Sequence, residues 1–176
     1  MRTSLIPVLR WQFDLTWSLL DGHLDALRDE DCLWDPAQLC WTVREVAPGI
    51  WLPDWAEPEP DPAPAATIGW FTWHIGWWWT ETLAHVAGDR PPARTEIRWP
   101  GSASGTVAWL RGLKERWIGV LDRLAEADLD AVAPYPWQDQ QDRTVAHMIG
   151  WVNAELMKNT AEIGQLRFLR IARNTR

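Results

Sequence analysis

Two imidazoles and a carboxylate are predicted to share one face of an apolar helix over residues 66–87. His74, Trp78, Glu81 and His85 follow one another at steps of four, three and four residues. At about 100° per residue, these four side chains fall within a sector of roughly 60°. Bundle proteins build metal and ligand sites from such inward-facing groups, so this face is a candidate site.

A second row of polar side chains is predicted on the last helix, over residues 143–172. Its members recur every three or four residues and are His147, Trp151, Glu155, Lys158, Glu162 and Gln165. An apolar stripe that includes Val152, Leu156 and Ile163 runs directly beside this row and is expected to face the core. A polar row that borders the core is typical of a pocket wall between helices. We therefore expect a pocket lined by Lys158, Trp78, Trp151 and Glu81.

These side chains are positioned by four predicted helices, over residues 4–29, 66–87, 103–126 and 143–172. Ser102 or Ser104 is expected to cap the third helix, and Gly88 is a plausible stop for the second. The connection over residues 30–66 carries seven prolines, which prevent a regular helix there, and Trp41, Trp51 and Trp55 are expected to pin it. No series of β-strands is predicted. The pattern indicates an all-α four-helix bundle with long, Pro- and Trp-rich connections, in a single domain over residues 1–176.

Composition and charge narrow the classes of function that the chain can have. The chain has 176 residues and a formal net charge of -7, with 17 Lys and Arg against 24 Asp and Glu. A chain this acidic is not expected to bind nucleic acid, because phosphate recognition needs a basic face. The most apolar segment, residues 67–86, contains His74, Glu81 and His85, so no membrane span is expected. No secretory signal is visible, and a cytoplasmic protein is the expectation.

Sixteen tryptophans stand out against one tyrosine and three phenylalanines. Packing in the core and the loops accounts for most of these rings, since each can bury about 150 to 250 Å². Two or three of them remain for an aromatic-lined pocket or a dimer face.

Three runs of residues resemble the DinB/YfiT-like superfamily of bacterial four-helix proteins, in its actinobacterial-type branch. They are WHIGWW over residues 73–78, CWTVRE over residues 40–45 and WVNAELMKNTAEIGQLRFL over residues 151–169. The resemblance covers nearly the whole chain. It implies a DinB-like bundle, often a homodimer, with a metal held by one His of the second helix and two His of the last. It also implies transferase, isomerase or hydrolase chemistry on a small molecule with a low-molecular-weight thiol.

Carried onto this chain, the family's ligand positions fall on His74, Lys158 and Glu162. A protonated Lys158 cannot coordinate a cation, so the resemblance implies an altered site. Glu155, one turn earlier, is a substitute, which gives His74, Glu155 and Glu162 as a ligand set for a divalent ion such as zinc or nickel. Such an ion would lower the pKa of a bound thiol or water.

Two other interpretations stay open for the last helix. Lys158 replaces the charge of the metal and pairs with Glu155 or Glu162, which leaves a non-catalytic small-molecule-binding or dimerisation module. Alternatively, Glu155, Lys158 and Glu162 form a solvated row of ion pairs on the helix surface. The orientation of His74 relative to Glu162 and Lys158 distinguishes these cases.

Overall fold

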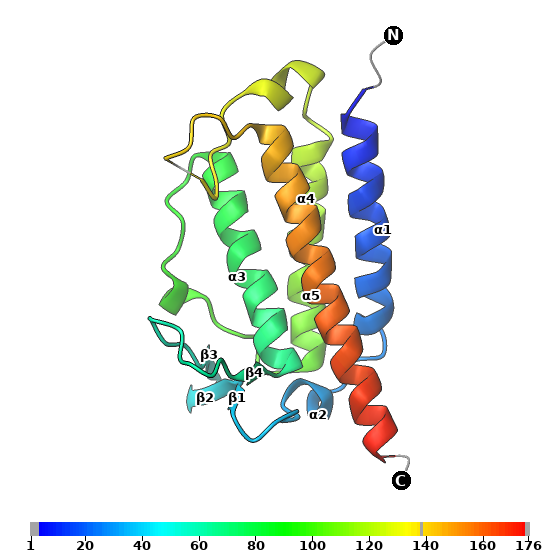
Figure 1. The fold of residues 1–176 in the computed structure, drawn as a ribbon, viewed down its shortest axis with the longest axis vertical. Coiled ribbons are helices and arrows are strands. Elements are labelled where there is room, and N and C mark those ends of the chain that lie inside the picture. Colours follow the sequence, from blue (N-terminus) through cyan, green and yellow to red (C-terminus); the bar gives the residue numbers. More distant parts are fainter. Residues whose placement is uncertain (1–3, 138, 175–176) are drawn as a thin grey trace.

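Four long helices form the body of the protein, as the computed structural model shows for residues 4–137 and 139–174 (Figure 1). They are α1 (Ile6–Leu24), α3 (Ile68–Ala87), α4 (Ala103–Leu121) and α5 (Val145–Asn174). The connections contain a short helix, α2 (Asp29–Cys32), and two 3-10 turns, η1 (Arg94–Glu96) and η2 (Glu126–Asp130). The predicted all-α four-helix bundle is confirmed. None of the described helices has both the length and the apolar character needed to cross a bilayer.

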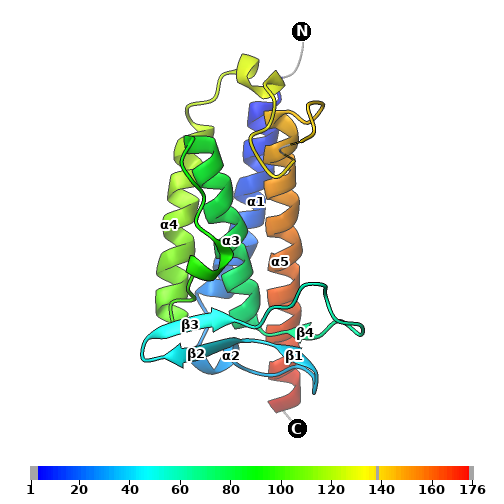
Figure 2. The same cartoon turned by 90° about the vertical axis from the view of Figure 1, so that its left-hand side faces the viewer.

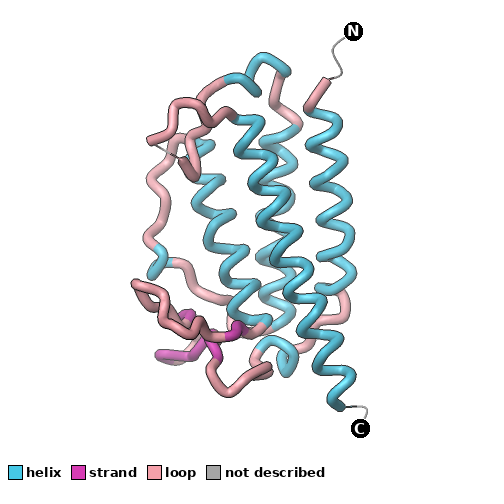
Figure 3. The backbone as a smooth tube through the Cα atoms, viewed as in Figure 1, coloured by secondary structure: helices cyan, strands magenta, loops and turns pink. Residues whose placement is uncertain are grey.

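The helices run in two parallel pairs. Helices α1 and α5 descend from the end of the bundle that holds the N-terminus, whereas α3 and α4 ascend (Figures 1 and 2). The connection over residues 88–102 returns along the outside of the bundle, so α4 begins at the same end as α3 (Figure 3). Both α1 and α3 pack against α4 and α5. As a result, α3 and α5 lie antiparallel to each other.

The predicted residues Gly88 and Ser102 end α3 and cap α4, and Thr67, which was not predicted, caps the start of α3. The Thr67 hydroxyl accepts a hydrogen bond from the Trp70 N–H at 3.2 Å, and Gly88 ends α3 with a left-handed φ of 74°. Ser102 caps α4 by accepting a hydrogen bond from the Gly105 N–H at 3.1 Å. Each cap satisfies a backbone group that the helix itself leaves unpaired.

The first helix is shorter than the predicted span of residues 4–29, because it ends at Leu24. Arg28 is extended, and α2 then begins as a separate turn. The Asp29 carboxylate accepts a hydrogen bond from the Ala103 N–H at 2.6 Å, and Asp31 pairs with Arg170 of α5. These two contacts with residues far away in the sequence fix the direction of α2. Similarly, the third helix ends at Leu121 and not at residue 126.

The Pro-rich connection contains short strands that the sequence did not predict. Strand β1 (Cys40–Trp41) pairs in parallel with β4 (Ala65–Ala66), and β2 (Val43–Ala47) pairs antiparallel with β3 (Ile50–Pro53). Strands of two to five residues are too short for a visible alternation of apolar and polar positions. The expected pinning by tryptophan is confirmed, since Trp41 and Trp55 stack on Trp70 of α3 and Trp51 packs edge-on against Trp99.

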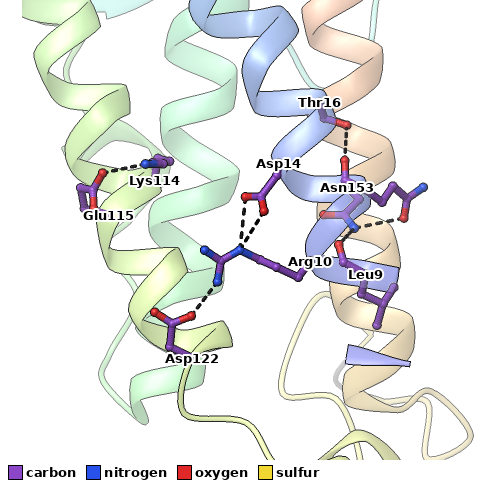
Figure 4. Close-up of polar contacts among 9 residues, drawn as sticks. Leu9, Arg10, Asp14, Thr16, Lys114, Glu115, Asp122 and Asn153 are labelled. Atoms are coloured by element: carbon purple, nitrogen blue, oxygen red, sulfur yellow. Dashed lines mark hydrogen bonds and ion pairs between the residues drawn. The ribbon is translucent and has the colours of Figure 1, made fainter. Parts of the chain in front are cut away.

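Polar contacts orient α1 between its two neighbours (Figure 4). Arg10 lies between Asp14 of its own helix and Asp122 after α4, with a nitrogen to oxygen distance of 2.6 Å to Asp122. On the other side, the Asn153 amide of α5 donates hydrogen bonds to the Leu9 carbonyl and the Gln12 side chain at 3.0 and 3.1 Å. These contacts fix which face of α1 is turned into the bundle.

The packing of α3 on α4 predicts the effect of a single methyl group. A Cβ atom at Gly76 would lie 1.8 Å from the Trp109 ring, so Gly76→Ala must displace that indole. We expect a net loss of about 1–2 kcal/mol in the free energy of unfolding, because overpacking costs more than the roughly 1 kcal/mol that alanine gains in a helix. Urea denaturation measures this.

Gly112→Ala in α4 is the matched control. Its Cβ would meet no atom within 4 Å, so we expect stabilisation by about 0.5–1 kcal/mol. Equal effects of the two substitutions would contradict the close approach of Trp109 to α3.

Candidate functional site

A buried amide joins α3 to α5 at the centre of the candidate site. The Asn159 side chain is 1% exposed. Its Oδ1 accepts a hydrogen bond from the Trp78 Nε1–H at 3.2 Å, and its Nδ2–H donates to Glu162 Oε2 at 2.8 Å. A buried amide must find partners for both of its ends, and here one partner comes from each helix.

Lys158 and Glu155 form an ion pair on the same side of α5. The distance from Lys158 Nζ to Glu155 Oε2 is 2.6 Å. The Lys158 side chain is half exposed, whereas that of Glu155 is 23% exposed. The pair therefore lies at the edge of the helix interface. It is less exposed than a row of ion pairs in bulk water would be, and more exposed than a buried ammonium that replaces a metal ion.

His74 is enclosed by indole rings on α3. Its ring stacks on Trp70 with centroids 5.1 Å apart, and Trp77 contacts it edge-on at 5.7 Å. Its Nδ1 is buried and has no hydrogen-bond partner among the described residues. Burial and the nearby Lys158 ammonium lower the pKa of His74 to about 4, while the Asn159 amide and the Glu155 carboxylate act in the opposite direction. His74 is therefore neutral near pH 7.

The expected metal ligands do not form a ligand set in this arrangement. The Glu155 carboxylate is engaged by the Lys158 ammonium, and Glu162 accepts from the Asn159 amide. The Lys158 ammonium, whose charge already acts on His74, disfavours the binding of a second cation there. Within residues 4–137 and 139–174, no three His, Cys, Asp or Glu side chains are grouped so that they can hold a metal ion. The donors present therefore do not fit a metal ion as they stand.

The aromatic residues expected to line a pocket mostly pack against one another. Trp78 is 2% exposed, and its ring meets the half-buried Trp151 edge-on at 5.5 Å. Glu81 accepts a hydrogen bond from Trp77 Nε1–H at 2.8 Å. Tyr135 inserts between His85 and Trp151, and burial, reinforced by the Glu81 carboxylate, raises the pKa of its phenol. Indole and phenol rings thus occupy the space beside Trp78.

A hollow lies at the base of the α3–α5 interface, about one turn of α3 before His74. Its volume is about 530 Å³, and its wall is largely apolar. Phe71 of α3, Leu166 of α5 and the short strand β4 contribute to this wall, with Glu162 and Gln165 as its polar members. Glu162 therefore connects the hollow to the hydrogen bonds of Asn159. The hollow is open to solvent and not enclosed, and its volume lies within the range of small-molecule sites.

Two residues of this site were missed in the sequence. Asn159 occupies the apolar stripe of α5 between Leu156 and Ile163, and a lone amide at such a position was the available signal. Tyr135 lies in a connection without periodicity, so no pattern pointed to it. The hollow depends on β4, which the sequence did not reveal.

Comparison with known proteins gives a family match over most of the chain. The family model described as the DinB superfamily matches residues 12–163. This span includes α3, α4 and α5 as far as Ile163, so it contains Lys158 and Glu162 but not Gln165 and Leu166 of the hollow. No curated protein matches the chain.

The electrostatic effect of the Lys158 ammonium on His74 predicts a change in titration. Removing the ammonium in Lys158→Gln should raise the pKa of His74 from about 4, yet keep it below 6.5, because burial is the larger cause and persists. Titration of the His74 ring protons by NMR measures the change. Lys114→Gln on α4 serves as the control and should leave His74 unaffected; an unchanged pKa of His74 in Lys158→Gln would contradict this electrostatic effect.

Proposed function

The chain belongs to the DinB superfamily, and we propose that it is a metal-independent member that binds a small molecule in the hollow beside Glu162. The observation that carries this proposal is the engagement of both candidate carboxylates by protein donors. Lys158 holds Glu155 at 2.6 Å, and Asn159 holds Glu162 at 2.8 Å. In this proposal, Lys158 supplies the positive charge that a metal ion supplies elsewhere.

Electrostatic balance supports an unreactive role for these groups. A neutral His74 needs no counterion, and the Glu155–Lys158 pair is itself neutral. His74, Glu155 and Lys158 together carry no net charge, and Glu162, which accepts its hydrogen bond from the neutral Asn159 amide, is the carboxylate whose charge is not balanced within this group. What remains open to a ligand is the hollow and the carboxylate at its wall.

The lining of the hollow points to an apolar ligand with a positive charge. Phe71 and Leu166 offer apolar surface. Glu162 receives a hydrogen bond from a neutral amide and forms no ion pair with a described Lys or Arg. Its negative charge at an apolar wall is best complemented by an ammonium group.

Binding of simple amines tests this function. Titration of the protein with benzylamine, followed by protein NMR, should shift signals of Phe71 and Leu166, and benzyl alcohol should bind about tenfold more weakly because it forms no charge-assisted hydrogen bond. Glu162→Gln should remove this difference, whereas Glu115→Gln on α4 should preserve it. Shifts confined to other surfaces, or absent with every probe, would overturn the proposal.

A second candidate is a metal-dependent transferase or hydrolase that uses a low-molecular-weight thiol. One observation favours it: the buried His74 Nδ1 lacks a partner among the described residues, and a neutral imidazole is a competent metal ligand. The ligand set would be His74, Glu155 and Glu162, and both carboxylates would have to leave their present partners.

Element analysis separates the two candidates. We expect protein purified without chelators to contain zinc and nickel well below one equivalent. The double substitution Lys158→His and Glu162→His should raise the content toward one equivalent, because it removes the ammonium and adds two imidazoles near His74. Stoichiometric metal in the unaltered protein, lost in His74→Ala, would instead establish the second candidate.

A further inference from the structure

Two open hollows adjoin each other along α4, on the side of that helix that meets α3. One, of about 500 Å³, lies between α4 and the C-terminal end of α3. The other, of about 490 Å³, lies between α4, α3 and the connection over residues 88–102. Arg116 lines both, so the two hollows form one groove, which we call the α4 groove. Among the described residues, its lining shares no member with the hollow beside Glu162.

The α4 groove gathers the arginines that the protein leaves without a partner. Within residues 4–137 and 139–174, every other Arg and Lys side chain forms an ion pair, makes a hydrogen bond or lies over an aromatic ring. Those without such a contact are Arg98, Arg116 and Arg123, and all three are exposed and line the groove. The chain has 24 Asp and Glu for 17 Lys and Arg, so a shortage of carboxylates does not explain their isolation.

Two glycines of α4 leave open space beside Arg116. Gly112 and Gly119 lie about one turn before and one turn after it, and its other two neighbours on the helix surface are apolar. A Cβ atom at Gly112 would meet no atom within 4 Å, and one at Gly119 would meet the Arg123 guanidinium at 3.5 Å. Helix α4 therefore places no carboxylate one turn from Arg116 and keeps the space around its guanidinium free.

The carboxylates that line the groove are engaged by other groups. Glu115 pairs with Lys114, with a nitrogen to oxygen distance of 2.8 Å. Glu96 accepts a hydrogen bond from the Ala93 N–H at 2.6 Å and lies 3.4 Å from the Arg90 guanidinium. The three arginines of the groove thus have no direct counterion among the described residues, and the groove is suited to an anion from solution.

We propose that the α4 groove binds a small molecule that carries a diphosphate group. A guanidinium offers a planar pair of N–H donors that matches two phosphate oxygens. Seven residues separate Arg116 from Arg123, which corresponds to about two helical turns or roughly 10 Å, so both flexible side chains can reach one diphosphate. The half-buried Val86 and Trp109 provide apolar surface for the organic part of the ligand.

A small ligand fits the charge of the protein better than a nucleic acid or a membrane does. Both of those partners present many phosphates over a wide area and require a broad basic face. The basic groups of the groove are few and lie within a chain of net charge -7. The site is also separate from the hollow beside Glu162 and does not depend on the amine binding proposed there.

Calorimetric titration with inorganic pyrophosphate, in low salt and without divalent cations, tests the groove. We expect a Kd of about 0.1 mM or lower, and inorganic phosphate should bind about tenfold more weakly because it engages fewer guanidinium groups. Arg116→Gln should weaken pyrophosphate binding by about tenfold or more. Arg116→Lys should retain part of the affinity, since it keeps the charge but loses the planar pair of donors.

Protein NMR locates the binding site. Pyrophosphate should shift the amide signals of Gly112 and Gly119, which line the groove. Because Arg116 is exposed and has no partner among the described residues, circular dichroism should show an unchanged helix content in both Arg116 variants.

Arg44→Gln is the matched control, since it removes one positive charge on β2, where Arg44 pairs with Asp54 outside the groove. It should leave pyrophosphate binding intact, and so should Glu162→Gln, so this proposal and the proposed function fail independently. No binding at millimolar pyrophosphate, or an equal loss in Arg44→Gln and Arg116→Gln, would overturn the proposal. Tighter binding to single-stranded DNA or to phosphatidylglycerol vesicles than to pyrophosphate would do the same.

Discussion

The buried Asn159 amide is the constraint on which the site depends. Once this side chain lies between α3 and α5, its carbonyl needs a donor and its NH₂ group needs an acceptor, because an unsatisfied amide in the core costs on the order of 1–3 kcal/mol. Trp78 supplies the donor and Glu162 the acceptor. The orientation of the Glu162 carboxylate is thereby set by the core, and the same contacts hold the two helices in register.

The state of the neighbouring groups follows from that register. Lys158 precedes Asn159 on α5 and pairs with Glu155 at the rim of the interface. Its ammonium acts on His74, which burial already favours in the neutral form. One region of the interface therefore contains a neutral imidazole, a closed ion pair and a hydrogen-bonded carboxylate. In the proposed function, this distribution of charge leaves the Glu162 carboxylate as the group that a small-molecule ligand would meet.

The tryptophans divide the molecule into two apolar regions. Trp78, Trp79 and Trp117 belong to the core between the four helices. Trp70, Trp73 and Trp99 form a separate cluster beneath α3, onto which the Pro-rich connection folds. This second cluster covers the lower end of α3 and positions β4 at the wall of the hollow, so a connection without regular helix contributes directly to the site.

Sequence reasoning located the helices and the polar row of α5 correctly, because apolar spacing and cap residues are local. The predicted C-terminal end of the first helix was wrong for a nonlocal reason: Asp29 and Asp31 bind to Ala103 and Arg170, which lie far along the chain. Glu155, Lys158 and Glu162 were singled out as one group. The sequence left open whether a metal ion, pairing with one another or hydration at the surface would stabilise their charges. Asn159, which engages one of them, was overlooked as part of an apolar stripe.

The sequence by itself determined an all-α bundle, the helix ends at Ser102 and Gly88, and the faces that His74 and Glu162 occupy on their helices. Only the tertiary structure decided that α3 and α4 run parallel, and which donor each carboxylate receives. The physical reason is that periodicity encodes the apolar face of one helix, whereas a hydrogen bond such as that between Trp78 and Asn159, 81 residues apart, depends on how two helices are rotated and shifted against each other.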